Sequence, residues 1–286
     1  MENIILYILI FCIGTVFGSF FTLAVYRLPL HQDITHKRSY CPNCNHKLSF
    51  FDMIPVLSYI FLGGKCRYCK QKIRPRYLCL EILTGITFLL FAMSINLDFH
   101  IINTSKFVYL VFGILYMAGL IIIAGIDKEK YKIQKSLIIY ETVVVCTYII
   151  YLYTVEHANI YRYVIYLFAF LIFVLLENAY YNKKLKDYYP LEILQLSMIM
   201  AMFQHEFIFV FTVILTLLAI SIKCIIKHLN QRSNKVVKTE KKYYLNLPIG
   251  YYLCCSNIIV MIVINFIAFR GGNLIWKVIR ELHFMM

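Results

Sequence analysis

The sequence is poor in charged residues, in glycine and in proline. Charged residues make up 15% of the 286 residues, and there are 11 Gly and 6 Pro. Soluble domains carry about 25% charged and about 45–50% apolar residues, so the low charge excludes an ordinary soluble domain. The scarcity of Gly and Pro argues against a flexible, linker-rich chain. Hydrophobic residues reach 61% and the mean hydropathy is +0.70, which together indicate an integral membrane protein.

Several enzyme signatures are also absent. The sequence has no Gly-rich phosphate loop, no H-E-x-x-H and no G-x-S-x-G, so it offers no motif for a P-loop, a zincin or an α/β-hydrolase. The net charge of +14 is high, but basic residues in membrane proteins mark cytoplasmic loops and contacts with anionic lipid. We therefore expect membrane lipid as a partner and no nucleic acid.

Long apolar runs predict an all-α polytopic fold with about eight transmembrane helices. A helix needs roughly 20 mostly apolar residues to cross a bilayer. The first run is too long for the apolar core of a signal peptide and lacks an A-x-A-like cleavage site, so we expect it to be a retained span. Glu192, Gln195 and Gln204 interrupt the sixth run. The expected spans are about 3–25, 78–97, 107–126, 134–154, 160–178, 189–205, 207–226 and 249–269.

Lysine and arginine in the short loops predict how the helices are oriented. The loop 26–77 holds ten Lys or Arg and two acidic residues, which predicts a cytoplasmic location. Crossing back and forth then places the basic loops 127–133, 179–188 and 227–248 on the same side. The C-terminal tail is the exception, because its basic residues fall on the expected outer side.

Four cysteines lie in the first basic loop. Cys41, Cys44, Cys66 and Cys69 form the pattern C-x2-C-x21-C-x2-C, in which each pair can form a knuckle and two knuckles can supply a tetrahedral zinc site. A closed set of four thiolates leaves no open position, so the role would be structural. Two disulfides are the alternative, but the cytoplasm is reducing. The spacing therefore predicts a small zinc-knuckle domain.

Three further stretches complete a resemblance to a known family. They are "GSFFTLAVYRLP" (18–29), "RPRYLCLEILTG" (74–85) and "LPIGYY" (247–252). Together with the four cysteines, they make the chain similar to the type IV prepilin peptidases. The resemblance implies a protein of the bacterial inner membrane that cleaves a short basic leader from prepilin-like proteins. It also implies possible N-methylation of the new amino terminus, with S-adenosylmethionine as a cofactor.

Three domains are expected on this basis. Residues 1–25 form the first span, residues 26–77 the cytoplasmic zinc-binding domain, and residues 78–286 the peptidase bundle. Glu81 begins the second span, where it could balance the dipole of the helix N-terminus. The resemblance includes this glutamate and implies a supporting or cofactor-binding role for it.

Asp127 ends the third span in "LIIIAGIDKEKYKI". A carboxylate at a span end can be a simple boundary residue, but an ionisable group at membrane depth is costly and usually functional. The resemblance identifies Asp127 with the first catalytic aspartate of the family. The family has an Ile-Pro several residues later, whereas here Ile133 is followed by Gln134.

Aspartyl chemistry needs a second carboxylate, so that one group acts as base and the other as acid. The family supplies it from a Gly-x-Gly-Asp motif, which this sequence lacks. Two acids are available in the corresponding region. Asp187 has the right side chain but lies in a Lys-rich loop, where a solvated surface charge is the simpler interpretation. Glu192 begins the sixth span, where the alignment favours it, although it could also cap that helix.

Three functions remain open from the sequence. The first is an intramembrane aspartyl peptidase that uses Asp127 with Glu192 or Asp187. The second is a catalytically degenerate pseudopeptidase that binds prepilins or assembly components through its zinc domain. The third is a polytopic transporter, but the intramembrane charges of transporters cluster near the midplane, whereas those of this chain gather at one face.

Overall fold

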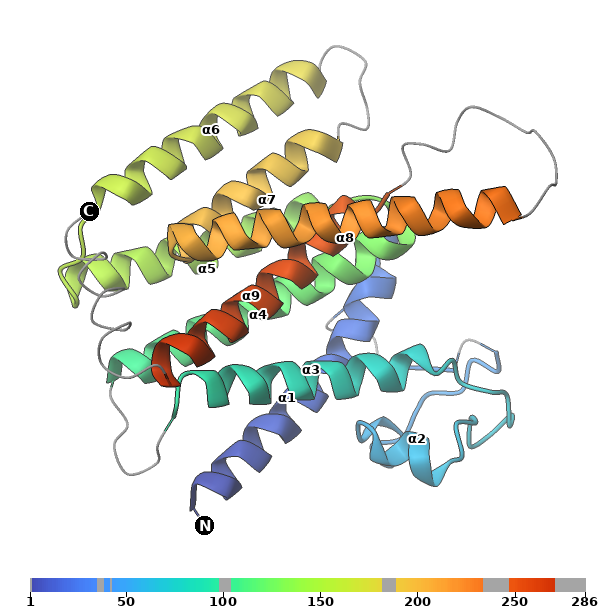
Figure 1. Cartoon of the computed structure of the whole chain (residues 1–286). Helices are drawn as coiled ribbons and strands as arrows, with labels where there is room; N and C mark the ends of the chain where they lie inside the picture. The colour runs from blue at the N-terminus through green and yellow to red at the C-terminus, as the bar shows by residue number, and fades with distance from the viewer. Residues whose placement is uncertain are drawn as a thin grey trace. The chain divides into compact units, whose positions relative to one another are not determined.

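The structure is a computed structural model that describes residues 2–34, 39–41, 43–97, 104–181, 189–233 and 247–270. Within these ranges the protein is helical, and the extended pairing is confined to two isolated bridges. The all-α prediction is thereby confirmed. The longer helices are α1 (Glu2–Arg27), α3 (Arg76–Ser94), α4 (Thr104–Lys130), α5 (Lys135–Thr154), α6 (Tyr161–Tyr181), α7 (Tyr189–Phe203), α8 (Glu206–Ser233) and α9 (Ile249–Arg270) (Figure 1).

Seven of these helices are long and apolar enough to cross a membrane. The expected sixth span is the exception, because α7 has 15 residues. At 1.5 Å per residue such a helix is about 22 Å long, less than the roughly 30 Å of a bilayer core. Pro190 lies in its first turn, and the helix ends at Phe203, directly before the polar pair Gln204 and His205. The sequence predicted the element correctly but overestimated its length.

The chain divides into two compact units, Met1–Ile114 and Leu115–Met286. In the first unit α1 packs against α3. Two glycines of α1, in the pattern Gly-x-x-x-Gly, allow this close approach, because a Cβ atom at Gly14 would lie 2.7 Å from the Cα of Gly85 and one at Gly18 would lie 2.7 Å from the Cα of Glu81. The expected second span therefore packs against the first.

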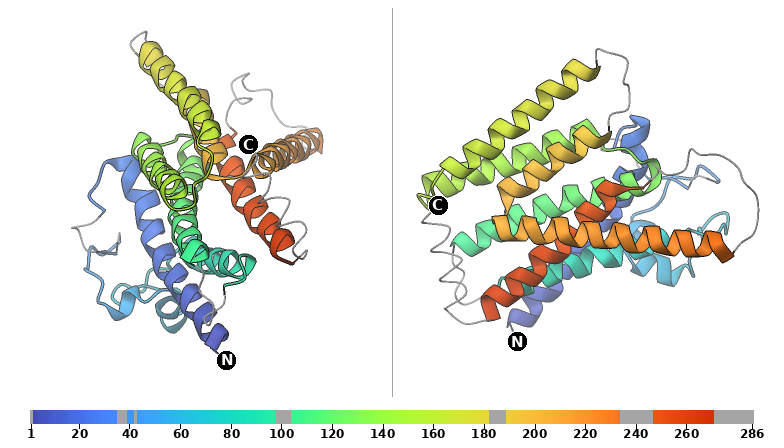
Figure 2. Two further views of the ribbon diagram at one scale, coloured as in Figure 1. Left: turned by 90° about the vertical axis from the view of Figure 1, so that its left-hand side faces the viewer. Right: turned by 45° about the horizontal axis from the view of Figure 1, so that its top comes forward.

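Short elements join α1 to α3. They are the 3-10 helices η1 (Leu28–Leu30) and η2 (Phe51–Met53) and the five-residue helix α2 (Leu57–Phe61), which packs against η2. In the second unit α7 contacts α5, α6, α8 and α9, so a short helix lies at the centre of that bundle (Figure 2).

Candidate functional site

The four cysteines of the first unit form two knuckles with the same local geometry. In the first, the backbone N–H of Cys41 donates to the carbonyl of His46 and that of Asn45 donates to Cys41. In the second, Cys66 and Lys70 repeat these two bonds, with Gln71 as the acceptor for Cys66. The residue after each second cysteine has a positive φ, 54° at Asn45 and 59° at Lys70. Each C-x-x-C therefore closes into the same tight turn.

The knuckles bring the four sulfur atoms together. All four Sγ atoms lie within 4.8 Å of one another, and Cys41 Sγ is 3.8 Å from Cys69 Sγ. A tetrahedral zinc site with Zn–S bonds of about 2.3 Å requires sulfur atoms about 3.8 Å apart. All four are free thiols, and the Asn43 side chain donates to Cys69 Sγ at 3.5 Å. The four cysteines can therefore bind a metal such as zinc.

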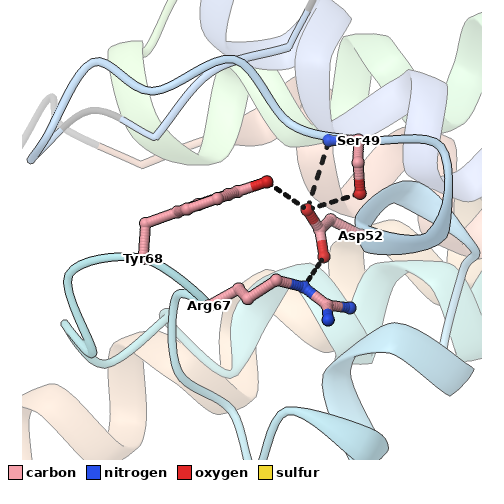
Figure 3. A network of polar contacts seen from close by, with 4 residues as sticks. All are labelled: Ser49, Asp52, Arg67 and Tyr68. Carbon is pink, nitrogen blue, oxygen red and sulfur yellow. Dashed lines mark hydrogen bonds and ion pairs between the residues drawn. The ribbon is translucent and has the colours of Figure 1, made fainter.

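Asp52 connects the second knuckle to the Ser49 segment through polar contacts (Figure 3). Its carboxylate accepts hydrogen bonds from the Ser49 hydroxyl at 2.7 Å and from Arg67 Nε at 2.6 Å, and Tyr68 lies 3.5 Å away. Burial alone would raise the pKa of Asp52, but the bonds from Ser49 and Arg67 outweigh it and hold the pKa below its usual value. Since Arg67 and Tyr68 lie inside the second C-x-x-C, the carboxylate ties that knuckle to the Ser49 segment.

Glu81 contacts the same domain from α3. Its Oε2 accepts a hydrogen bond from the backbone N–H of Val56 at 2.8 Å. Val56 has a φ of 62°, which is unusual for a β-branched residue, and this bond holds the turn that begins α2. Glu81 thus contacts the protein's own backbone. The supporting or cofactor-binding role expected for Glu81 stays a prediction.

Asp127 lies in the last turn of α4 and is completely buried. The Tyr189 hydroxyl lies 2.7 Å from each of its carboxylate oxygens, and the backbone N–H of Tyr251 donates to Oδ2 at 2.8 Å. The backbone N–H of Gly250 donates in turn to the Tyr189 hydroxyl at 3.0 Å. A helix N-terminus offers free N–H groups of this kind, so the start of α9 forms a cradle for the carboxylate.

Glu192 lies one helical turn after Tyr189 on α7. Its Oε2 lies 3.4 Å from the backbone nitrogen of Ile133, so it contacts the segment that follows Asp127. The first turn of α7 therefore holds both ends of residues 127–133. Within the described ranges no hydrogen bond joins Glu192 to Asp127, and Asp187 falls in 182–188, outside them. The choice between the two as the second acid stays a prediction.

Glu141 is a second completely buried acid of the same unit. In the part of the chain that the structure describes, neither of its carboxylate oxygens has a hydrogen-bond partner. The carboxylate lies against the backbone of Gly119 on α4, where a Cβ atom would overlap it. Glu141 therefore has the burial of a site residue without the polar surroundings of one.

Tyr189 and the start of α9 were not among the residues expected from the sequence. The run "LPIGYY", noted for its resemblance, contains Gly250 and Tyr251, so a signal for them was present. A Cβ atom at Gly250 would lie 3.1 Å from Asp127 Oδ2, which explains why glycine suits this position. No sequence signal distinguished Tyr189 from the other tyrosines.

Comparison with known proteins assigns the first unit. Residues 12–95 match the model of the bacterial peptidase A24 N-terminal domain. Several curated relatives carry the name prepilin leader peptidase/N-methyltransferase. These matches make the chain similar to the type IV prepilin peptidase family. The matched range contains the Gly-x-x-x-Gly contact, all four cysteines, Asp52 and Glu81.

Three relatives from this family illustrate the extent of the match. The protein from Myxococcus xanthus (strain DK1622) is 41% identical over 81 residues, 28% of this chain and 24% of the relative. The Klebsiella pneumoniae protein is 32% identical over 134 residues, 45% of this chain and 55% of the relative. The Bacillus subtilis (strain 168) protein is 30% identical over 132 residues, 46% and 50% respectively. The chain thus spans about half or less of these relatives, and no solved structure matches it significantly.

Proposed function

We propose that this protein is an intramembrane aspartyl peptidase that removes the leader of prepilin-like proteins. The names of its relatives support the substrate class. The observation that carries the chemistry is the buried carboxylate of Asp127, held by a tyrosine hydroxyl and a helix N-terminus. A carboxylate fixed in this way at the end of a membrane helix can take a proton from water that attacks the scissile carbonyl.

Glu192 is the proposed acid that completes the reaction. It lies on the same short helix as Tyr189, which already contacts Asp127. In the reaction it would protonate the leaving amine while Asp127 acts as base, and Asp187 is the alternative for this role. The zinc proposed for Cys41, Cys44, Cys66 and Cys69 is structural, and no chemical step depends on it.

The names of the relatives extend the proposal to methylation. They pair the leader peptidase with an N-methyltransferase. Methylation of the new amino terminus would take its methyl group from S-adenosylmethionine. Such a reaction would be visible as one added methyl group on the processed prepilin.

A second candidate function is a pseudopeptidase that binds prepilins without cleaving them. The contact that favours it is the tyrosine hydroxyl of Tyr189 on Asp127, at a place where aspartyl chemistry requires a second acid. The cysteine domain would then serve as the docking part.

Co-expression with a prepilin from the same cell distinguishes the two functions. The mass of the recovered prepilin shows whether the leader is removed and whether a methyl group is added. Leader removal that is lost in the Asp127→Asn variant supports the peptidase. A full-length prepilin that copurifies with the unchanged protein supports the pseudopeptidase instead. The Glu141→Gln variant is the matched control, because it alters an equally buried acid in the same unit.

A further inference from the structure

The cysteine domain exposes a cluster of large apolar side chains. Phe61 is 83% exposed, Ile60 61% and Leu57 51%, and these three lie on one face of α2. Phe50 and Phe51, at the start of η2, are 72% and 70% exposed. Because η2 packs against α2, the five side chains form one surface, which we name the α2 patch. A patch of this kind marks a contact with another apolar phase or partner.

A hydrogen bond fixes the depth of the α2 patch relative to a membrane helix. Val56, the residue before α2, donates its backbone N–H to Glu81 at 2.8 Å. Glu81 lies five residues into α3, about 7.5 Å along a helix that is a candidate span. The beginning of α2 therefore lies beside the second turn of α3. A depth of about 7.5 Å from the start of a spanning helix matches the roughly 5–10 Å by which interfacial helices bury their apolar face.

The exposed basic side chains of the same domain favour contact with an anionic lipid. Asp52, a nearly buried acid of this domain, forms an ion pair with Arg67. Other basic side chains are exposed around it. They are Lys47, Lys65, Lys70, Lys72 and Arg74. Basic side chains at a membrane surface attract anionic headgroups and would repel the basic leader expected of the substrate.

We propose that the α2 patch inserts into the headgroup and acyl boundary of an anionic bilayer and that the surrounding basic residues bind the headgroups. The protein would then contact the membrane through this in-plane surface as well as through its spanning helices. Such a contact would hold the zinc domain at the membrane surface. It does not depend on peptidase activity.

Tryptophan quenching in vesicles tests this proposal. The chain contains a single tryptophan, Trp276, so a Trp276→Phe background allows one reporter to be placed at will. The test variant carries Phe61→Trp and the control carries Tyr68→Trp, an exposed aromatic of the same domain outside the patch. Both full-length variants are reconstituted into vesicles of phosphatidylglycerol and phosphatidylcholine. The zinc content of each confirms that the domain is folded.

Quenching by lipids brominated on their acyl chains gives the result. The reporter at position 61 should be quenched several-fold more strongly than the reporter at position 68, and less so when phosphatidylglycerol is left out. Equal quenching of both reporters would overturn the proposal. A reporter at position 61 that is shielded from both brominated lipid and aqueous acrylamide would overturn it as well, because protein would then cover the patch.

Discussion

The cysteine centre and the surroundings of Asp127 are assembled over very different distances in the chain. The four sulfur ligands come from residues 41–69, and each knuckle closes with hydrogen bonds between near neighbours. The contacts of Asp127 join α4, α7 and α9, and the one with Tyr251 spans 124 residues. Local spacing therefore suffices for the first site, whereas the second exists only after the helices have packed.

The two sites also differ in what holds their side chains in place. A knuckle fixes its ligands by turns that a sequence motif encodes, and bound metal would hold them further. Asp127 instead depends on a neighbouring helix end and on one hydroxyl group, both placed by tertiary packing. Glu141, buried in the same unit without such neighbours, shows that burial alone does not build a site.

The largest expected effect is on the chemistry at Asp127. The Asp127→Asn variant should lose leader cleavage by about 10²–10⁴-fold, because an amide cannot accept a proton from water. Mass spectrometry of a co-expressed prepilin measures the loss. The Glu141→Gln variant should cleave normally. Normal cleavage by the Asp127→Asn variant would rule out the aspartyl mechanism.

In the cysteine domain, substitution of one zinc ligand should abolish zinc binding almost completely. A Cys66→Ser variant should bind no zinc and should expose the loop to protease, because metal binding and folding are coupled in such small domains. Metal analysis of the purified protein checks the content, for which we expect one zinc per chain. Cys79→Ser, outside the knuckles, is the control. An unchanged protein without zinc would contradict the metal assignment.

Substitutions of the two candidate acids, Glu192 and Asp187, should differ in how strongly they impair cleavage. We expect Glu192→Gln to impair cleavage more than Asp187→Asn, because Glu192 lies on the helix turn that contacts residues 127–133. An ordinary surface carboxylate tolerates substitution within about 0.5 kcal/mol of stability. Cleavage assays on both variants decide the matter. The opposite order would mean that the alignment of the sixth helix is displaced by five residues.

Removal of the Tyr189 hydroxyl should have an intermediate effect. Tyr189→Phe keeps the ring but deletes the donor to Asp127, and a hydrogen bond to a charged group contributes about 1.5–3 kcal/mol. We expect cleavage to fall by about 10-fold or more, since about 1.4 kcal/mol corresponds to tenfold. Tyr131→Phe, on an exposed tyrosine near the end of α4, serves as the control. A Tyr189→Phe variant that cleaves faster would instead show that the hydroxyl blocks the site.

The smallest expected effect is at Asp52. Asp52→Asn removes the ion pair with Arg67, whose side chain is 50% exposed and therefore screened by solvent. Exposed pairs contribute about 0.2–1 kcal/mol, so the zinc site should survive with a modestly faster loss of metal to a chelator. The rate of zinc transfer to a chromogenic chelator measures this. A complete loss of zinc would show that Asp52 is required to form the second knuckle.

Much of the protein followed from the sequence. The apolar runs located the eight long helices of the described residues, because a membrane helix must be apolar over its length. The spacing of the cysteines predicted their cluster, since a C-x-x-C closes locally whatever surrounds it. Asp127 was selected from the sequence by its depth in a span and by the resemblance.

Tertiary structure alone decided what surrounds each buried acid. The sequence could not show that the Tyr189 hydroxyl contacts Asp127, because that contact joins residues 62 positions apart through the packing of α7 against its neighbours. It also could not show that the Glu141 carboxylate has no hydrogen-bond partner among the described residues, while Glu81 accepts a hydrogen bond from Val56. Helix formation is local and is encoded by composition, whereas the contacts of a buried side chain are set by which helices meet and in which rotation.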